Sequence, residues 1–239
     1  MTKPYVPNDA WSQKAAKEGY RARSVYKLME LDEKFKLLRT GMTVLDLGAA
    51  PGSWLQYTAK KIGPKGRTIG LDLTPIESVA ENVRTMTVDI LDEQAVDAAL
   101  QRFFVTPIRR PAPPSPGGGR STSIISSSNE TSQTSLTSLT SQASPFDLVL
   151  SDIAPSTTGI RDVDQWRSIE LNQCVLRVAE RWLKPGGRCV LKVFRGADFD
   201  AFLAELRRNW AEVKPAHVAA SRDRSMEIYL VLRKGPVKV

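Results

Sequence analysis

Three charged residues interrupt or border apolar runs, where a charge is costly unless it is paired or lines a pocket. Lys192 stands inside the run CVLKVF, Asp152 directly follows the run FDLVLS, and Glu227 opens the run EIYLVL. We expect Lys192 to be paired or to line a pocket, Asp152 to be placed for chemistry at the end of a strand, and Glu227 to be a partner for a lysine. An ordinary strand-end charge is the alternative for Lys192 and Glu227.

The stretch VLDLGAAPGSW at residues 44–54 predicts a strand, a tight turn and a helix start. Gly48 and Gly52 can adopt positive φ and carry no Cβ, so the backbone can approach a ligand closely while its N–H groups and the helix N-terminus face that ligand. Their G-x-x-x-G spacing is neither the dinucleotide pattern G-x-G-x-x-G nor the phosphate loop G-x-x-x-x-G-K-[ST]. The turn therefore favours an adenosine cofactor without phosphates over a nicotinamide dinucleotide.

Three further residues are candidates for contacts with such a cofactor. Asp72 and Asp89 each stand at the predicted carboxyl end of a strand, where open α/β sheets bind ligands. One carboxylate could accept hydrogen bonds from ribose hydroxyls, and the other could bind an adenine amino group. Turn formation or helix capping is the alternative for both. Trp54 either lies beside the cofactor or packs in the core.

Strand and helix patterns alternate along the chain, which predicts one α/β domain with a mostly parallel sheet. Seven strands are expected, at 44–47, 67–73, 85–88, 146–150, 188–194, 212–218 and 227–233. Helices are expected at 23–38, 53–62, 92–104 with Asp92 as N-cap, 169–183 and 200–209.

Two segments differ in composition from this domain, which we place at 22–239. Residues 1–21 form a basic N-terminal arm, and residues 106–145 are rich in Ser, Thr, Pro and Gly. The second segment lacks the apolar residues needed for a core, so it is predicted to be a disordered insertion in one crossover. A linker is the simpler interpretation of it, and a regulatory role is the alternative.

The composition narrows the class of partner and compartment. A net charge of +8 favours a polyanionic partner. Cys174 and Cys189 show no metal-ligand or disulfide spacing, and His217 is the only histidine. No apolar stretch reaches membrane-span length. We therefore expect a cytoplasmic protein without metal or membrane. Contacts with such a polyanion are expected from a set of basic residues, Lys14, Lys17, Arg21, Arg23, Lys34 and Lys36.

Taken in order, the motifs RSVYKL, GAAPGSW, SDIAP, LKVF and SRDRSMEIY resemble the FtsJ/RrmJ-type 2′-O-ribose RNA methyltransferases. The resemblance implies a Rossmann-like, S-adenosylmethionine-dependent fold with a seven-stranded, mostly parallel sheet flanked by helices. It places a Lys-Asp-Lys-Glu catalytic tetrad on Lys27, Asp152, Lys192 and Glu227. It places S-adenosylmethionine contacts on Gly52, Trp54, Asp72, Asp89 and Asp152. Ser53 and Ser156 depart from the residues that many members have.

The reaction implied is in-line transfer of a methyl group to a ribose 2′-hydroxyl. Lys192 either accepts the hydroxyl proton as a neutral amine or, as an ammonium, stabilises the developing alkoxide. By the same resemblance the substrate is a uridine of large-subunit ribosomal RNA, within the large ribosomal subunit, and the enzyme is a monomer. Methylation of tRNA or an RNA cap is the first alternative. A non-catalytic RNA-binding assembly factor is the second. Base methylation is disfavoured because no stacking aromatic follows Asp152.

Overall fold

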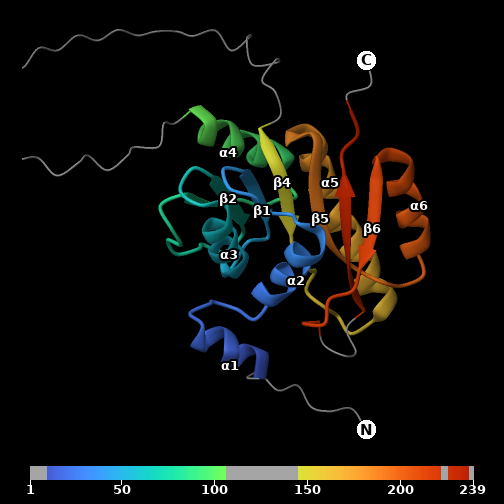
Figure 1. The fold of residues 1–239 in the computed structure, drawn as a ribbon. Coiled ribbons are helices and arrows are strands. Elements are labelled where there is room, and N and C mark those ends of the chain that lie inside the picture. The colour runs from blue at the N-terminus through green and yellow to red at the C-terminus, as the bar shows by residue number, and fades with distance from the viewer. Residues whose placement is uncertain (1–9, 106–144, 222–225, 237–239) are drawn as a thin grey trace, which may run out of the picture.

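The computed structural model describes residues 10–105, 145–221 and 226–236, which form a seven-stranded sheet with helices on both faces (Figure 1). The strands, in spatial order, are β3 (Val83–Thr87), β2 (Arg67–Asp72), β1 (Thr43–Leu47), β4 (Phe146–Ser151), β5 (Leu183–Phe194), β7 (Glu227–Arg233) and β6 (Glu212–Ala216). The first five pair in parallel, whereas β7 is antiparallel to both of its neighbours. The predicted seven-stranded, mostly parallel α/β sheet is confirmed.

Helices divide between the two faces of the sheet. One face carries α2 (Val25–Phe35) and α3 (Ser53–Ile62), and the other carries α4 (Glu93–Val105), α5 (Arg161–Trp182) and α6 (Phe199–Asn209). Alternate strand residues therefore serve two cores. On β5, Val190 packs with the α2–α3 side, and Cys189 and Leu191 pack with the other side.

The carboxyl ends of the parallel strands meet at one edge, which is the lower edge of the sheet in Figure 1. The helix α1 (Ala10–Lys17), inside the expected basic arm, lies near this edge. Its Ala15 is buried, and Lys14 Nζ lies 4.7 Å from the centre of the Tyr26 ring on α2. Part of the arm is thus a helix attached to the domain by a small apolar and cation–π contact.

Several boundaries differ from the prediction. The helix α5 begins at Arg161 rather than at residue 169 because its first two turns bury polar groups, which leave no apolar periodicity. Asp164, for example, accepts backbone hydrogen bonds from Thr158 and Gly159. The strand β5 begins at Leu183, before the expected turn, and its register with β4 shifts there. Asp92 caps α4 as predicted, since its Oδ1 accepts from the backbone N–H of Ala95.

The expected insertion and the expected lack of membrane spans and metal sites can be compared with the structure only for the described residues. The expected insertion at 106–145 lies outside the described residues except for Pro145. Within the described ranges, no helix is long and apolar enough to cross a bilayer, and no cluster of three His, Cys, Asp or Glu side chains could hold a metal ion.

Candidate active site

The pairing of β5 with β7 brings the candidate residues to one face of the sheet. Lys192 is opposite Tyr229, and Phe194 is opposite Glu227. Residues opposite each other in an antiparallel pair point to the same side, and Tyr229 belongs to the core beneath α2 and α3. Lys192 and Glu227 therefore face α2, whose first turn carries Lys27.

The four expected tetrad residues come together as two ion pairs. Lys27 Nζ lies 2.5 Å from Glu227 Oε1, and both side chains are only 10% exposed. Lys192 Nζ lies 3.0 Å from Asp152 Oδ1 and also donates to the backbone oxygen of Asp152 over 2.5 Å. Four residues from different elements of the chain are thus gathered at the carboxyl edge, where charges are held by one another rather than by bulk water.

Tyr229 connects the two ion pairs and was missed in the sequence. Its hydroxyl donates to Asp152 Oδ1 over 2.6 Å, and Lys27 Nζ lies 5.8 Å from the centre of its ring. Burial, together with the charges of Asp152 and Glu227, raises the pKa of the Tyr229 hydroxyl well above its usual value. Tyr229 is therefore a neutral donor. Its position two residues after Glu227, on the same face of the strand, was the available signal.

Glu227 is held as a carboxylate. Burial pushes its pKa upward, but the charge of Lys27 and hydrogen bonds from Lys27 and Ser221 outweigh this effect, so the pKa lies below its usual value. The Ser221 hydroxyl donates to Glu227 Oε1 over 2.5 Å. The carboxylate consequently fixes the ammonium of Lys27 at the edge of the site.

The two glycines of the turn between β1 and α3 have positive φ, of 76° for Gly48 and 101° for Gly52. A Cβ on Gly48 would lie 2.9 Å from Ile153 Cβ, in the loop that carries Asp152. A Cβ on Gly52 would lie 2.9 Å from Arg21 Nη1. Both glycines thus let neighbouring protein segments pack against the turn. The close approach of this backbone to a cofactor stays a prediction.

Asp72 and Asp89 lie at neighbouring strand ends beside this turn. Asp72 accepts from the backbone N–H groups of Ala50 and Thr74, one on each carboxylate oxygen. Asp89 Oδ1 accepts from the backbone N–H of Leu91. Each carboxylate oxygen can accept a second hydrogen bond, so both groups shape their own loops and still offer acceptors to a ligand.

Trp54 and Ser53 connect the same turn to α2. The Trp54 ring is buried against Tyr229, and its Nε1–H donates to the Ser24 backbone oxygen over 2.8 Å. The hydroxyls of Ser24 and Ser53 are 2.9 Å apart and share a hydrogen bond. The Trp54 side chain is thus packed in the core. Its backbone N–H lies in the first turn of α3, where it has no helical acceptor, and the expected cofactor contact stays a prediction. Ser53 directs its side chain toward α2.

Asp46 on β1 is a second group that the sequence did not single out. Only 1% of it is exposed, and its Oδ2 has no hydrogen-bond partner. Burial and the charges of Asp152 and Asp72 raise its pKa well above the usual value. Asp46 is therefore a buried carboxyl group beneath the turn whose surroundings favour its neutral form, and it is hidden within an apolar run in the sequence.

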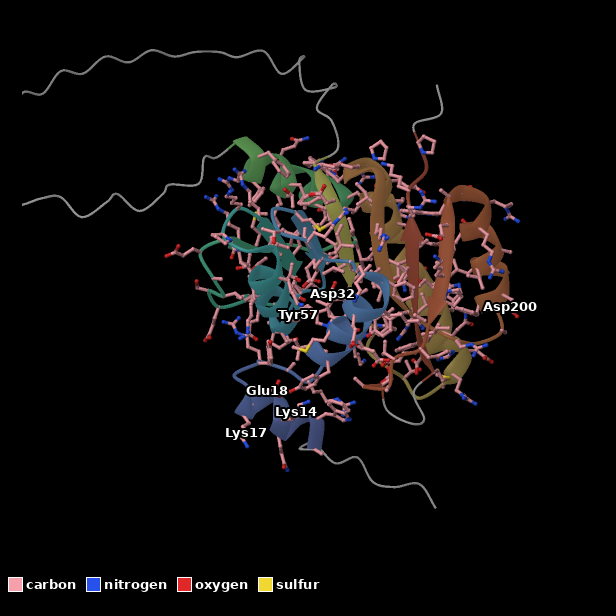
Figure 2. All side chains as sticks on the ribbon, viewed as in Figure 1. Lys14, Lys17, Glu18, Asp32, Tyr57 and Asp200 are labelled. Carbon is pink, nitrogen blue, oxygen red and sulfur yellow. The ribbon has the colours of Figure 1, made fainter. Side chains whose placement is uncertain are left out.

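Arg21 makes structural contacts within the protein, and its expected contact with RNA stays a prediction. Its guanidinium donates to the backbone oxygens of Pro51, Glu77 and Ser78 at 2.8–3.1 Å. It therefore fastens the loop after β2 to the glycine turn. Figure 2 shows Lys14 and Lys17 on α1, and it shows Tyr57 of α3 next to Asp32 of α2. The Tyr57 hydroxyl donates a hydrogen bond to the Asp32 carboxylate over 2.9 Å.

Both cysteines are buried and free, and burial raises the pKa of the Cys189 thiol. Cys189 lies in the core on the side of α4, α5 and α6, and Cys174 is a buried residue of α5. His217 lies on the loop that follows β6. None of these residues contributes a contact to the ion pairs of the site described above.

Comparison with known proteins gives one consistent result. The model of the FtsJ-like methyltransferase family matches residues 20–235. A ribosomal RNA large subunit methyltransferase E of Bdellovibrio bacteriovorus is 37% identical over 95% of this chain and 96% of that protein. One of the same name from Myxococcus xanthus is 39% identical over 97% of this chain and 91% of its own length. A crystal structure described as a ribosomal RNA methyltransferase of Plasmodium falciparum shares the fold, with a TM-score of 0.67, 23% identity and coverage of 90% of this chain and 98% of its own.

Proposed function

The chain belongs to the FtsJ-like methyltransferase family, and from this premise we propose that it methylates ribose 2′-hydroxyls of ribosomal RNA, using S-adenosylmethionine. The relatives named ribosomal RNA large subunit methyltransferase E support RNA of the large ribosomal subunit as the substrate. A uridine is the target nucleotide that the family resemblance implies. The observation that carries the proposal is the convergence of Lys27, Asp152, Lys192 and Glu227 at the carboxyl edge.

The residues around the glycine turn fit S-adenosylmethionine. The carboxylates of Asp72 and Asp89 have acceptor capacity left at adjacent strand ends, which suits ribose hydroxyls and an adenine amino group. The first turn of α3 offers backbone N–H groups to a carboxylate. Asp46 is a buried carboxyl with an oxygen that lacks a partner, beneath the same turn. When bound, the cofactor supplies an electrophilic methyl group on a sulfonium centre.

Besides binding the cofactor, the protein must provide for removal of the proton from the ribose 2′-hydroxyl. Two contacts to the oxygens of Asp152 orient Lys192 Nζ and leave one further position on the nitrogen. As a neutral amine, Lys192 would accept the hydroxyl proton there as the ribose oxygen takes up the methyl group. As an ammonium, it donates a hydrogen bond to the developing alkoxide and the proton leaves to water. We propose the first version, and the pH dependence of the rate distinguishes the two.

Asp152 has two roles in this proposal. Its side chain and backbone hold Lys192, and its loop packs through Ile153 against Gly48 of the cofactor turn. Tyr229 holds the same carboxylate from the other side. The Lys27 ammonium, which Glu227 holds in place, adds positive charge at the same edge of the sheet. Positive charge there favours an anionic ribose oxygen. The arrangement suits activation of a weakly acidic hydroxyl.

Labelled methyl transfer tests the proposal directly. Large ribosomal subunits that lack their native ribose methylation and unmodified tRNA are each incubated with the protein and labelled S-adenosylmethionine. We expect label only in the large-subunit RNA, and nuclease digestion followed by mass spectrometry should recover 2′-O-methyluridine. Label on tRNA alone would establish the alternative substrate. Binding of the subunits without any transfer would indicate an assembly factor.

A further inference from the structure

A basic hollow lies at the edge of the sheet opposite to the proposed active site. It has a volume of about 280 Å³ and is bounded by the C-terminal end of α2, the segment before β1, the starts of β4 and β5, and the end of β7. Five cationic side chains and one carboxylate line it, namely Lys36, Arg39, Lys184, Arg188, Arg233 and Asp147. We call this set the amino-edge hollow.

The charges of the amino-edge hollow are only partly neutralised. Lys184 pairs with Asp147 at 2.8 Å, and Arg233 lies 3.6 Å from a carboxylate oxygen of Glu212. Lys36 and Arg39 are exposed, and no acidic side chain in the described part of the chain pairs with them. The hollow therefore has excess positive charge from side chains that are free to contact an anion.

The hollow is built rather than a chance gathering of surface lysines. Arg188 Nη1 donates to the backbone oxygen of Phe35 over 2.5 Å, which ties the start of β5 to the end of α2. Lys36 follows with φ of 52°, so the chain leaves the helix in a left-handed turn. The Asp147 carboxylate accepts hydrogen bonds from Lys184 and from the backbone N–H of Thr43, so it connects the starts of β1, β4 and β5 at the base of the hollow. The cations thus have a defined frame.

The helix α2 joins this hollow to the active site. Lys27 stands in its first turn and Lys36 directly follows its last turn. At about 1.5 Å per residue, the two lysines are about 14 Å apart along the helix axis. This separation is within the reach of one bound RNA, since double-stranded-RNA modules contact about 16 base pairs at once. An RNA engaged at Lys192 can therefore extend along α2 to the hollow.

We propose that the amino-edge hollow binds a backbone phosphate of the substrate RNA, outside the nucleotide that is methylated. This assignment rests on the proposed function, because it takes ribosomal RNA as the ligand. Contacts of this kind position the RNA without reading its sequence. They contribute to affinity in a salt-dependent way and take no part in the methyl transfer itself.

The test removes the two free cations. The variant Lys36→Gln/Arg39→Gln is compared with wild type and with Arg207→Gln/Arg208→Gln, which removes the same charge from α6 on the other face of the sheet. Methyl transfer to undermethylated large ribosomal subunits is measured over a range of salt concentrations. We expect KM to rise about five- to fiftyfold in the first variant, and its salt slope to fall by about 1–2. The value of kcat and the affinity for S-adenosylmethionine should not change, and the α6 variant should behave as wild type.

The results that would overturn the hollow as an RNA phosphate site differ from those that would overturn the proposed function. If KM and the salt slope of Lys36→Gln/Arg39→Gln equal those of the α6 variant, the hollow binds no RNA phosphate. If inorganic phosphate binds to wild type and not to this variant while KM is unchanged, the hollow holds a free anion and the RNA assignment is wrong. If wild type transfers no methyl group, the proposed function fails, and filter binding of the same subunits still decides the assignment of the hollow.

Discussion

The Tyr229 hydroxyl donates a hydrogen bond to Oδ1 of Asp152, the same carboxylate oxygen that lies 3.0 Å from Lys192 Nζ. The tyrosine thereby fixes the carboxylate that fixes the lysine. Replacing Tyr229 by Phe keeps the ring in the core and removes only this hydrogen bond. A hydrogen bond to a charged group contributes about 1.5–3 kcal/mol, so kcat should fall about 10- to 100-fold. The affinity for S-adenosylmethionine, measured by calorimetry, should stay within about twofold, because the ring stays packed against Trp54 and Asp152 keeps its contact with Lys192.

A control for this substitution is Tyr57→Phe. Tyr57 also donates to a buried aspartate, Asp32, but between α2 and α3 and outside the proposed site. Both variants should lose stability, and only Tyr229→Phe should lose kcat. Equal losses of kcat in the two would show that Tyr229 is a structural residue alone.

The Lys27–Glu227 pair predicts a large effect on stability. Removing one partner of a buried ion pair leaves an uncompensated charge and costs about 3–5 kcal/mol. Lys27→Met and Glu227→Gln should each lower the free energy of unfolding by such an amount in urea titrations. The double variant should lose less than the sum, because neither charge is left alone. Lys14→Met, which removes one partner of the exposed pair with Glu18, should cost less than about 1 kcal/mol.

The same pair predicts part of the acid sensitivity. The folded-state pKa of Glu227 lies below its usual value because Lys27 and Ser221 stabilise the carboxylate against the effect of burial. Its contribution to stability is therefore present above the unfolded pKa of about 4.3 and is lost as the pH falls through the lower folded pKa. Glu227→Gln should flatten the pH dependence of unfolding in that acidic window. An unchanged acid limb would contradict the assigned ion pair.

The raised pKa of Asp46 predicts a pH dependence of stability opposite in sign to that of Glu227. The Asp46 pKa is raised by burial and by Asp152 and Asp72, so above the usual pKa the unfolded state ionises while the folded state stays protonated. Stability consequently falls with rising pH until the folded pKa is reached. Asp46→Asn should remove this decline and increase the free energy of unfolding at neutral pH. Asp200→Asn, an exposed position on α6 shown in Figure 2, should leave the decline in place.

Substitutions of Arg21 and Lys17 should have different effects, one on cofactor affinity and the other on RNA affinity. Arg21→Gln loses the donors to Pro51, Glu77 and Ser78 and frees the loop after Asp72. At about 1–2 kcal/mol, the loss should weaken S-adenosylmethionine binding about five- to thirtyfold. Lys17→Gln on α1 should instead weaken RNA binding and leave cofactor affinity unchanged. A loss of RNA affinity in Arg21→Gln with unchanged affinity for S-adenosylmethionine would instead indicate that Arg21 contacts RNA.

The sequence was sufficient where residue type and strand period determine the outcome. A lysine inside CVLKVF needs a partner, and the structure supplies Asp152 at the end of the adjacent strand β4. The seven strands and most helices follow from apolar periodicity in the same way. The position of Lys27 was available only through the family motif, because a lysine on an amphipathic helix ordinarily faces solvent.

Other features depend on contacts between distant segments. Tyr229 and Asp46 appear as members of apolar strands until the sheet brings Asp152 and Asp72 next to them. Arg21 appears as one more basic residue until its guanidinium meets three backbone oxygens of other loops. The early start of α5 is similar, because its buried face is polar and its partners lie in the preceding loop. Sequence periodicity contains no information on such pairings.

The central claim is that Lys192 handles the proton of a ribose 2′-hydroxyl in methyl transfer. The most direct measurement is the single-turnover rate of Lys192→Ala with labelled S-adenosylmethionine and undermethylated large ribosomal subunits, alongside Lys214→Ala from the edge strand β6 as control. We predict a rate at least about 10²- to 10⁴-fold below wild type for Lys192→Ala, with cofactor binding intact, and a normal rate for the control. A Lys192→Ala variant that transfers the methyl group at a near-normal rate would contradict the account.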